Sequence, residues 1–350
     1  MRLETRKGVS HVKEASISAG TYGAAPSVVL QAERYEAVVL PSVGAHLVSL
    51  RDVKMGLRFL REPLSPGSQD LSQYLQHPVP YGLPLLFPPN RISDGTFTFN
   101  GETYRFPINE PTLHNHLHGF FAKAAWEIVA RSATEGSARL VLRHLLREGD
   151  DVFRIFPHRL TLELDYTLSA DGLRQEVSVQ NDGDRPMPFL LGFHTALLVP
   201  FAPESTAEDC TVSVNIGQQW ELSDRKVPTG RIIRRDSMAE AIAHGTGDPY
   251  VHPIDALFSA APGDGPNECS VTDHKLGVRL VYQTGREYRA WMLWNSDAKS
   301  GFFCPEPMTC LVNAPNIALP PQETGMRALA PGERWSAVSR IFEEAVPAPQ

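Results

Sequence analysis

A single carboxylate near the C-terminus lies in surroundings that would favour leaving water. Glu306 stands between Pro305 and Pro307 in the run FFCPEPMTCLVNAPN at 302–316, among aromatic, cysteine and methionine residues. A desolvated carboxylate is costly unless a partner binds it, and burial raises its affinity for a proton. Both prolines fix φ and lack an N–H, which predicts a stiff segment that is not an internal strand. Glu306 is therefore a candidate general base, and an ion pair with an arginine such as Arg91 is the alternative.

A second candidate is a lone histidine in an apolar segment. His194 is the sole titratable group in PFLLGFHTALLVPF at 188–201. An imidazole titrates near neutral pH, so a buried one can act as a general acid. A histidine in an apolar strand is also commonly a hydrogen-bonded core residue, and this segment alone leaves both interpretations open.

Three histidines alternate in LHNHLHGF at 113–120, at positions His114, His116 and His118. Alternate side chains of a strand point to the same face, so the pattern predicts three imidazoles on one face. Such a set could hold a metal ion. The first carboxylate downstream is as far away as Glu127, which favours a polar pocket rim or an exposed turn over a metal site.

An arginine follows an apolar, proline-rich run in YGLPLLFPPNRISDG at 81–95. Arg91 and its neighbour Asn90 stand where the chain leaves that run and enters a turn. A guanidinium in this position needs a carboxylate partner, solvent or a polar ligand. The segment predicts either an ion-paired surface arginine or one that binds a ligand.

The elements that must position these residues are predicted to be β-strands. Leucines alternate with polar residues on both sides of Asp171-Gly172 in 157–183, which predicts a hairpin, and Asn100-Gly101 in 97–106 predicts another. Strands spread from about residue 28 to residue 343 predict one large antiparallel β domain over 1–350, with about the first 25 residues peripheral. Further strands are expected at 28–42, 138–147, 278–283 and 288–295, and short helices at 68–78 and 235–244.

The composition excludes several classes of protein. The 350 residues are 42% hydrophobic and 21% charged, as in globular proteins, and the net charge of −7 argues against a nucleic-acid partner. No run of about 18 apolar residues predicts a membrane span, and the first 20 residues lack the apolar core of a secretory signal. Four cysteines without a CxxC pair predict free thiols and a cytoplasmic location.

Taken in chain order, these segments resemble the aldose 1-epimerase (galactose mutarotase) family. The resemblance spans about 27–343 and implies a large antiparallel β-sandwich, often called a supersandwich. It also implies an isomerase that interconverts the α and β anomers of free aldoses without cofactor or metal. The matching motifs are NRISDGTFTFNGETYRFPIN at 90–109, LHGF at 117–120, GFHTALL at 192–198, FFCPEPMTCLVNAPN at 302–316 and APGERW at 330–335.

The resemblance also implies roles for individual residues. Glu306 would take the proton of the anomeric hydroxyl and His194 would protonate the ring oxygen. The two should face one cleft from opposite sides, a sugar ring's width apart. The implied partner is a small monosaccharide, without nucleic acid or membrane, and the protein would be a monomer or a homodimer. The implied sugar-binding residues are Asn90, Arg91, His118 and Asp255.

The chain departs from the family pattern at three places. Phe120 stands where the family typically has the second glycine of LHGG, and Ala256 follows Asp255 where a histidine is common. Thr195 and Ala196 follow His194 where the family usually has an aromatic residue. These differences concern the choice of sugar and leave the acid–base pair intact.

Three other functions remain as alternatives. A hexose-6-phosphate mutarotase would need converging cations, for which Arg231, Arg234 and Arg235 are the candidates. A non-catalytic sugar-binding protein could keep the same fold. A glycoside hydrolase would need a second carboxylate, which Asp255 could supply.

Overall fold

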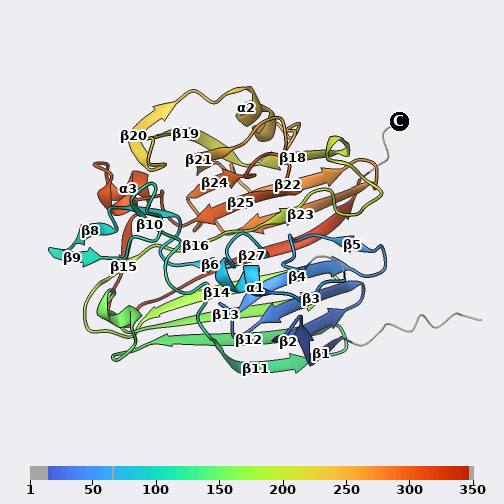
Figure 1. Cartoon of the computed structure of the whole chain (residues 1–350), viewed down its shortest axis with the longest axis horizontal. Coiled ribbons are helices and arrows are strands. Elements are labelled where there is room, and N and C mark those ends of the chain that lie inside the picture. The colour runs from blue at the N-terminus through green and yellow to red at the C-terminus, as the bar shows by residue number, and fades with distance from the viewer. Residues whose placement is uncertain (1–14, 65–66, 347–350) are drawn as a thin grey trace, which may run out of the picture.

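The structure, a computed structural model, describes residues 15–64 and 67–346. The described chain forms antiparallel strands with a few short helices, which confirms the predicted all-β class (Figure 1). The four cysteines are free, as predicted, and all four are buried. Within these residues, no helix is both long and apolar enough to cross a membrane.

The first sheet uses the N-terminal part of the chain and has five strands in sequence order. Its edge strand lies within the segment predicted to be peripheral, whose residues 1–14 fall outside the described residues. The single strand expected at 28–42 is two strands joined at Glu33-Arg34. The strands are β1 (Ser16–Tyr22), β2 (Ala25–Ala32), β3 (Tyr35–Leu40), β4 (His46–Asp52) and β5 (Leu57–Arg58).

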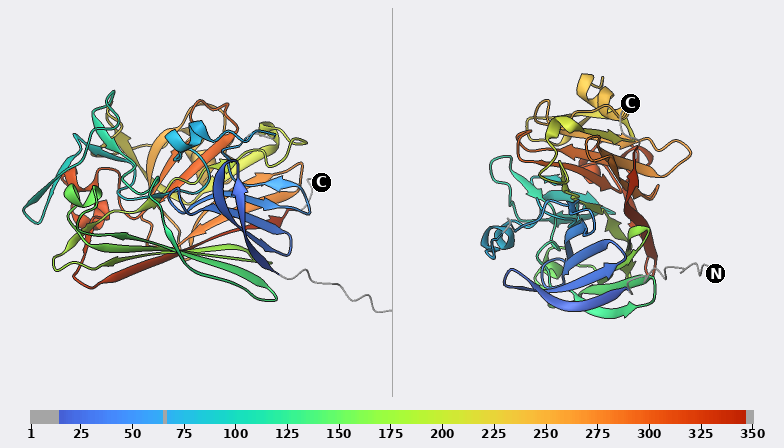
Figure 2. Two further views of the ribbon diagram at one scale, coloured as in Figure 1. Left: turned by 60° about the horizontal axis from the view of Figure 1, so that its bottom comes forward. Right: turned by 90° about the vertical axis from the view of Figure 1, so that its right-hand side faces the viewer.

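The second sheet has eight strands and extends below the other two in the left view of Figure 2. It contains the hairpin predicted around Asp171-Gly172, in which Ser169 pairs with Gly172. Strands β2 and β3 of the first sheet contact this hairpin and its neighbour. In spatial order the strands are β11 (Glu127–Ala133), β12 (Ser137–Leu146), β13 (Leu160–Ser169), β14 (Gly172–Asn181), β27 (Arg334–Ala345), β23 (Val278–Thr284), β22 (Asn267–Asp273) and β18 (Cys210–Val214).

The third sheet carries Glu306 on its strand β25, and His194 directly follows its short strand β16. Its strands come from four separate parts of the chain. In spatial order they are β20 (Pro228–Ile233), β19 (Ile216–Leu222), β21 (Asp255–Ala260), β24 (Ala290–Trp294), β25 (Phe302–Met308), β16 (Gly192–Phe193) and β6 (Leu85–Leu86), with β17 (Leu197–Leu198) also paired to β25.

Smaller elements surround the sheets. The hairpin predicted at Asn100-Gly101 is present and projects from one end of the molecule (Figure 1). Both helices expected from the sequence form, each shorter than its expected segment. The two-stranded ribbons are β7 (Arg91–Ser93) with β10 (Asn115–Leu117), β8 (Thr96–Phe99) with β9 (Glu102–Arg105), and β15 (Met187–Phe189) with β26 (Arg327–Leu329). The helices are α1 (Ser72–Gln76), α2 (Ser237–Ala243) and α3 (Pro321–Thr324), with short 3-10 turns at Val152–Arg154, Ala207–Asp209 and Ala314–Asn316.

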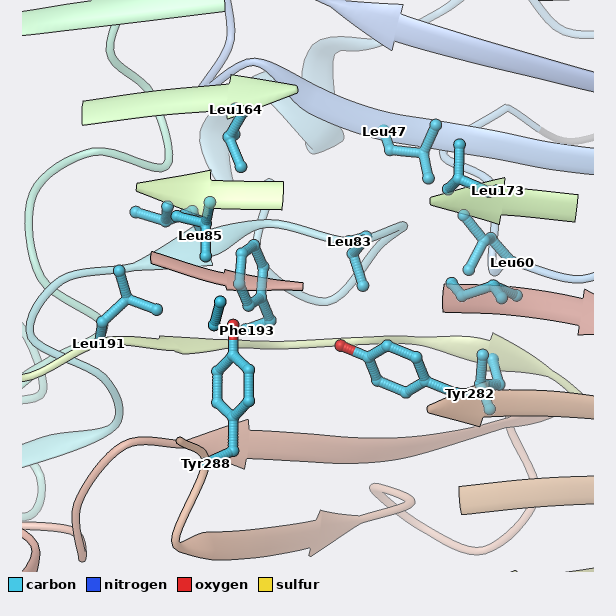
Figure 3. Close-up of a cluster of buried hydrophobic side chains, with 14 of the residues drawn as sticks. Leu47, Leu60, Leu83, Leu85, Leu164, Leu173, Leu191, Phe193, Tyr282 and Tyr288 are labelled. Atoms are coloured by element: carbon cyan, nitrogen blue, oxygen red, sulfur yellow. The ribbon is translucent and has the colours of Figure 1, made fainter. Parts of the chain in front are cut away.

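Apolar side chains from all three sheets meet in one core (Figure 3). Leu47 of the first sheet, Leu164 and Tyr282 of the second and Phe193 of the third are each at most 1% exposed. Burial of such a side chain contributes about 1.5–3 kcal/mol. The alternation of buried and half-buried residues along β13 is the pattern from which its strand was predicted.

The proline-flanked segment around Glu306 is an internal strand, so the sequence-based prediction for it was wrong. β25 lies between β24 on one side and the short strands β16 and β17 on the other. Its pairing with β24 runs from Trp294↔Cys304 to Ala290↔Met308 without a gap.

The side to which the proline nitrogens point explains this. In an antiparallel strand, the N–H and C=O of one residue point to the same neighbour, and successive residues alternate. Thr309, two residues beyond Pro307, donates its N–H to the Leu191 carbonyl oxygen (2.8 Å). The nitrogens of Pro305 and Pro307 therefore face this side, away from β24. Here the partner strand is interrupted between β16 and β17, the stretch that carries His194, so the missing N–H groups cost little.

An ionic contact joins the first sheet to the second. Arg34, between β2 and β3, pairs with Glu343 of β27, and its Nε lies 3.4 Å from Asp52 Oδ2. The carboxylate side chains of Glu343 and Asp52 are 4% and 0% exposed. Burial raises the pKa of Glu343 to about 7; the Arg34 charge opposes this rise and the Asp52 charge adds to it.

Glu343→Gln is expected to stabilise the protein increasingly as pH rises. A carboxyl with a raised folded-state pKa binds its proton more tightly in the folded chain. The free energy of unfolding therefore falls as pH rises from 4.5, the ordinary value, to about 7. The free energy of unfolding of the wild type falls by about 3 kcal/mol over this range. The variant has no carboxyl at this position, so it does not show this fall. Denaturant unfolding of both proteins between pH 4.5 and about pH 8 measures the difference.

Glu344→Gln is the matched control for that experiment. Glu344 is the next residue of β27, so it points to the opposite face, and its side chain is 47% exposed. The same pH-dependent gain in both variants would contradict the assignment to Glu343.

Candidate active site

A pocket of about 700 Å³ opens where the third sheet meets the ribbon β7–β10. All six residues predicted to form the site line it, although they come from five places in the chain. The rim is formed by the segment after α1 and by residues that follow β10. The predicted residues are Asn90, Arg91, His118, His194, Asp255 and Glu306, and the rim residues include Gln76, His77, Val79, Phe120 and Lys123.

The NRI and LHG motifs lie side by side because their strands pair. Arg91 is the register partner of Leu117, and the His118 N–H donates to the Asn90 carbonyl oxygen (2.9 Å). Gly119 follows with φ +67°, and a Cβ there would lie 2.1 Å from the Phe87 carbonyl oxygen. Any side chain would therefore push this segment off its neighbour, which explains the glycine of the motif.

His194 and Glu306 are in direct contact at the floor of the pocket. His194 Nε2 lies 3.2 Å from Glu306 Oε1, and the two side chains are 4% and 3% exposed. The expectation that they stand a sugar ring's width apart was therefore wrong. The reason is the interrupted ladder beside β25, which brings the chain that carries His194 close to the strand that carries Glu306.

Burial governs the protonation of this pair. It raises the pKa of Glu306 well above its ordinary value; the Asp255 charge adds to the rise, and Arg91 and Asn90 oppose it. Burial lowers the pKa of His194 to about 3, and the charge of Arg61 acts in the same direction. Both shifts favour the neutral acid beside the neutral imidazole. In that arrangement the pair holds one titratable proton and carries no net charge.

Arg91 is held by a carboxylate that the sequence analysis did not identify. Its guanidinium donates from Nε and Nη2 to Glu110, with both oxygens 3.0 Å from a nitrogen. Glu110 also accepts from the Asn115 side-chain amide (2.8 Å). A two-pronged contact of this kind fixes the plane of the guanidinium. Arg91 therefore lines the pocket in a set orientation, and Glu306 is not its ion-pair partner.

His118 and Asp255 complete the polar lining. The His118 ring stands edge to face with His194, with centroids 5.4 Å apart, and burial lowers its pKa well below the ordinary value. Asp255 Oδ2 lies 3.5 Å from Lys226 Nζ, which approaches from the turn between β19 and β20. No partner among residues 15–64 and 67–346 binds His118 Nδ1 or Glu306 Oε2, so these polar atoms have free hydrogen-bonding capacity.

The three histidines of LHNHLHGF do not share a face, which corrects the strand-based expectation. Only Asn115–Leu117 is a strand, and His114 and His118 flank it with φ of 55° and 64°. His114 contacts Asp94 (2.9 Å) at the surface, and His116 Nδ1 lies 2.9 Å from the Pro107 carbonyl oxygen. The left-handed residues turn the side chains in three directions, and only His118 lines the pocket.

The arginines considered for a phosphate site do not converge either. Arg231 pairs with Glu221 (2.7 Å) and Arg235 with Glu240 (3.0 Å). Neither these nor Arg234 is among the described residues that line the pocket. Their place on and beyond β20, at the edge of the third sheet, keeps them from it.

Sequence reasoning missed several lining residues. Trp294 ends β24 and lies beside His194, with ring centroids 5.5 Å apart. A tryptophan at a strand end was the available signal for it. Lys123, which also lines the pocket, and Glu110, which holds Arg91 without lining the pocket, gave no signal, because nothing in sequence spacing links them to the motifs.

Two solved structures resemble the whole described fold. A galactose mutarotase-like protein from Clostridium acetobutylicum has a TM-score of 0.90 and 31% identity, covering 95% of this chain and 99% of that chain. Galactose 1-epimerase from Lactobacillus acidophilus NCFM has a TM-score of 0.70 and 16% identity, with 95% and 99% covered. The second shows that the fold is shared.

Sequence comparisons point the same way. The uncharacterized protein YihR of Escherichia coli is 28% identical over 172 residues, 49% of this chain and 50% of that protein. Galactose mutarotase of Sus scrofa is 26% identical over 168 residues, 47% of this chain and 46% of that protein. These alignments span about half the length of each relative. The family described as Aldose 1-epimerase matches residues 26–341, nearly the full length, so the chain belongs to the aldose 1-epimerase family.

Proposed function

We propose that the protein is an aldose 1-epimerase, a mutarotase that interconverts the α and β anomers of a free aldose. The observation that carries the proposal is the buried contact between His194 and Glu306 in a pocket lined by further polar side chains. Ring opening needs one group to take a proton and another to give one. A pair that shares one proton meets this need without any net change in its charge.

The proposed reaction starts when the proton shared by the pair has passed from Glu306 to His194. Glu306, now ionised, takes the proton of the anomeric hydroxyl while His194 protonates the ring oxygen. The bond between the anomeric carbon and the ring oxygen breaks, and the free aldehyde forms. Rotation about the neighbouring C–C bond presents the other face of the carbonyl. The same two transfers then run in reverse, so that His194 takes the proton back and Glu306 returns its own.

The surroundings of the pair support these roles. A raised pKa makes the Glu306 carboxylate a stronger base, and a lowered pKa makes the His194 imidazolium a stronger acid. Burial thus favours the proton arrangement of the ring-opened state, in which Glu306 is protonated and His194 is neutral. For the sugar to lie between the two groups, their 3.2 Å contact must open when it binds.

The remaining polar lining is proposed to bind hydroxyls. Arg91 donates while Glu110 holds its plane, Asp255 and Asn90 accept or donate at other hydroxyls, and His118 contacts the sugar near the ring oxygen. A cytoplasmic location and a monomeric or homodimeric state stay predictions.

Glu306→Gln is expected to lower the rate of mutarotation by a factor of about 10²–10⁴, the usual contribution of general acid–base catalysis, while the fold persists. The amide keeps the shape of the side chain but cannot take the proton. Polarimetry on freshly dissolved α-D-galactose and α-D-glucose measures the rate, and circular dichroism checks the fold.

Glu62→Gln serves as the control for removing a buried carboxylate. Glu62 is 8% exposed, is bound by Ser49 and Arg51, and lies outside the residues that line the pocket. Its mutarotation rate is expected to match the wild type. A wild-type rate in Glu306→Gln would remove Glu306 from the mechanism.

Glu110→Gln is expected to raise KM several-fold with a smaller effect on kcat. The neutral amide cannot hold the Arg91 guanidinium by two charged contacts, so the hydroxyl-binding orientation is lost. Glu102→Gln, which breaks a half-buried pair with Arg185 away from the pocket lining, is the control. Unchanged KM for both hexoses would show that Arg91 does not bind the sugar.

A free aldose is expected to be a better substrate than its 6-phosphate. The pocket lacks converging arginines among the described residues, because Arg91 is neutralised by Glu110 and the β20 arginines are elsewhere. Rates on glucose and glucose 6-phosphate, compared at equal concentration, decide the point. A higher rate on the phosphate would favour the phosphosugar alternative.

A further inference from the structure

An aromatic residue from another strand occupies the vicinity of His194. The residues after His194, Thr195 and Ala196, leave the pocket without an aromatic ring from that segment. Trp294, a hundred residues further along, lines the pocket and is half-buried. Its ring meets that of His194 edge to face, at an interplanar angle of 68°.

The register of the third sheet places Trp294 among the polar groups of the site. Trp294 pairs with Asp255 on one side and with Cys304 on the other, and Met292 pairs with Glu306. Paired residues of an antiparallel sheet project from the same face, as do residues two apart on one strand. Trp294, Asp255 and Glu306 therefore rise from one face of the sheet.

The Trp294 indole is also packed against neighbouring side chains. Its ring packs at 5.2 Å from that of Phe302, and the Arg61 guanidinium carbon lies 3.9 Å over the Phe302 ring. Arg61 donates to the Pro80 carbonyl oxygen (3.1 Å) in the rim segment after α1. This series of contacts limits rotation of the indole, so a ligand meets a preorganised apolar surface.

We propose that Trp294 is the platform on which a pyranose ring rests in this pocket. An aldopyranose has hydroxyls around its edge and C–H groups on its faces. A rigid indole can bury one such face while Asn90, Arg91 and Asp255 reach the hydroxyls at the edge. Trp294 thereby sets the position of the ring relative to His194 and Glu306. The inference rests on the proposed function for the class of ligand.

Trp294→Phe and Trp294→Leu test the platform by fluorescence and kinetics. The other four tryptophans are at most 8% exposed, so a fluorescence change on adding D-galactose or D-glucose should come from Trp294. We expect this change to disappear in both variants. We expect KM to rise about 10-fold in Trp294→Leu, and less in Trp294→Phe, with kcat changed less than KM.

Trp220→Phe is the control, since Trp220 is a core residue that donates to Ser259 (3.0 Å) and lies outside the pocket lining. It should keep the sugar-dependent signal. A signal that persists in both Trp294 variants, or wild-type KM in both, would overturn the platform. Thermal melting identifies a variant that has simply unfolded, in which case the other variant decides.

The same measurements separate this inference from the proposed function. If the fluorescence of the wild type responds to the hexose through Trp294 but the protein does not catalyse mutarotation, the platform is supported and the proposed function is contradicted. If the wild type catalyses mutarotation and both Trp294 variants keep its KM and its fluorescence response, the proposed function is supported and the platform is contradicted. Absence of both the response and the turnover in the wild type would overturn both.

Discussion

The site depends on one interruption in a hydrogen-bond ladder. Along β25, the strand on one side is continuous, and the strand on the other side breaks between β16 and β17. Pro305 and Pro307 direct their nitrogens at that break, so neither side of β25 offers an unpaired N–H. The freed chain brings His194 over the strand and against Glu306. Without the break, residues 194–196 would continue the ladder, and their side chains would alternate between the two faces of the sheet.

The same arrangement explains why two ionisable groups, Glu306 and His194, can be buried. A buried carboxylate or imidazolium alone would be costly, but the two share a proton and can both be neutral. One polar atom of the pair remains unsatisfied, because Glu306 Oε2 has no hydrogen-bond partner within the described chain. A sugar hydroxyl that enters the pocket can form the hydrogen bond that Glu306 Oε2 lacks. The pocket thus retains hydrogen-bonding capacity for a polar ligand.

Much of the fold could be predicted from the sequence because local patterns determine it. The leucines of β13 and the Asp171-Gly172 turn specify a hairpin by their own spacing, and the structure contains it. The convergence of Asn90, Arg91, His118, His194, Asp255 and Glu306 on one pocket followed from the resemblance, since no local pattern relates residues so far apart.

Other features escaped prediction because they depend on long-range pairing. Whether a proline interrupts a ladder is decided by the neighbouring strand, and the sequence of β25 does not contain that information. The partners of Arg91 and His194 are likewise chosen by strand register. For the histidines near 116, positive φ at His114 and His118 overrode the period-two pattern.

The close approach of Gly119 to the Phe87 carbonyl has a consequence for how such a pocket can diversify. The segments that carry Asn90 and His118 are locked together there, so neither can shift alone. By contrast, His77 to Pro80 and Lys123 lie in connecting segments outside the strands. Substitutions can therefore accumulate at the mouth while the floor stays fixed. Substitutions at the rim can therefore change which sugar the pocket accepts while the acid–base pair at its floor stays the same.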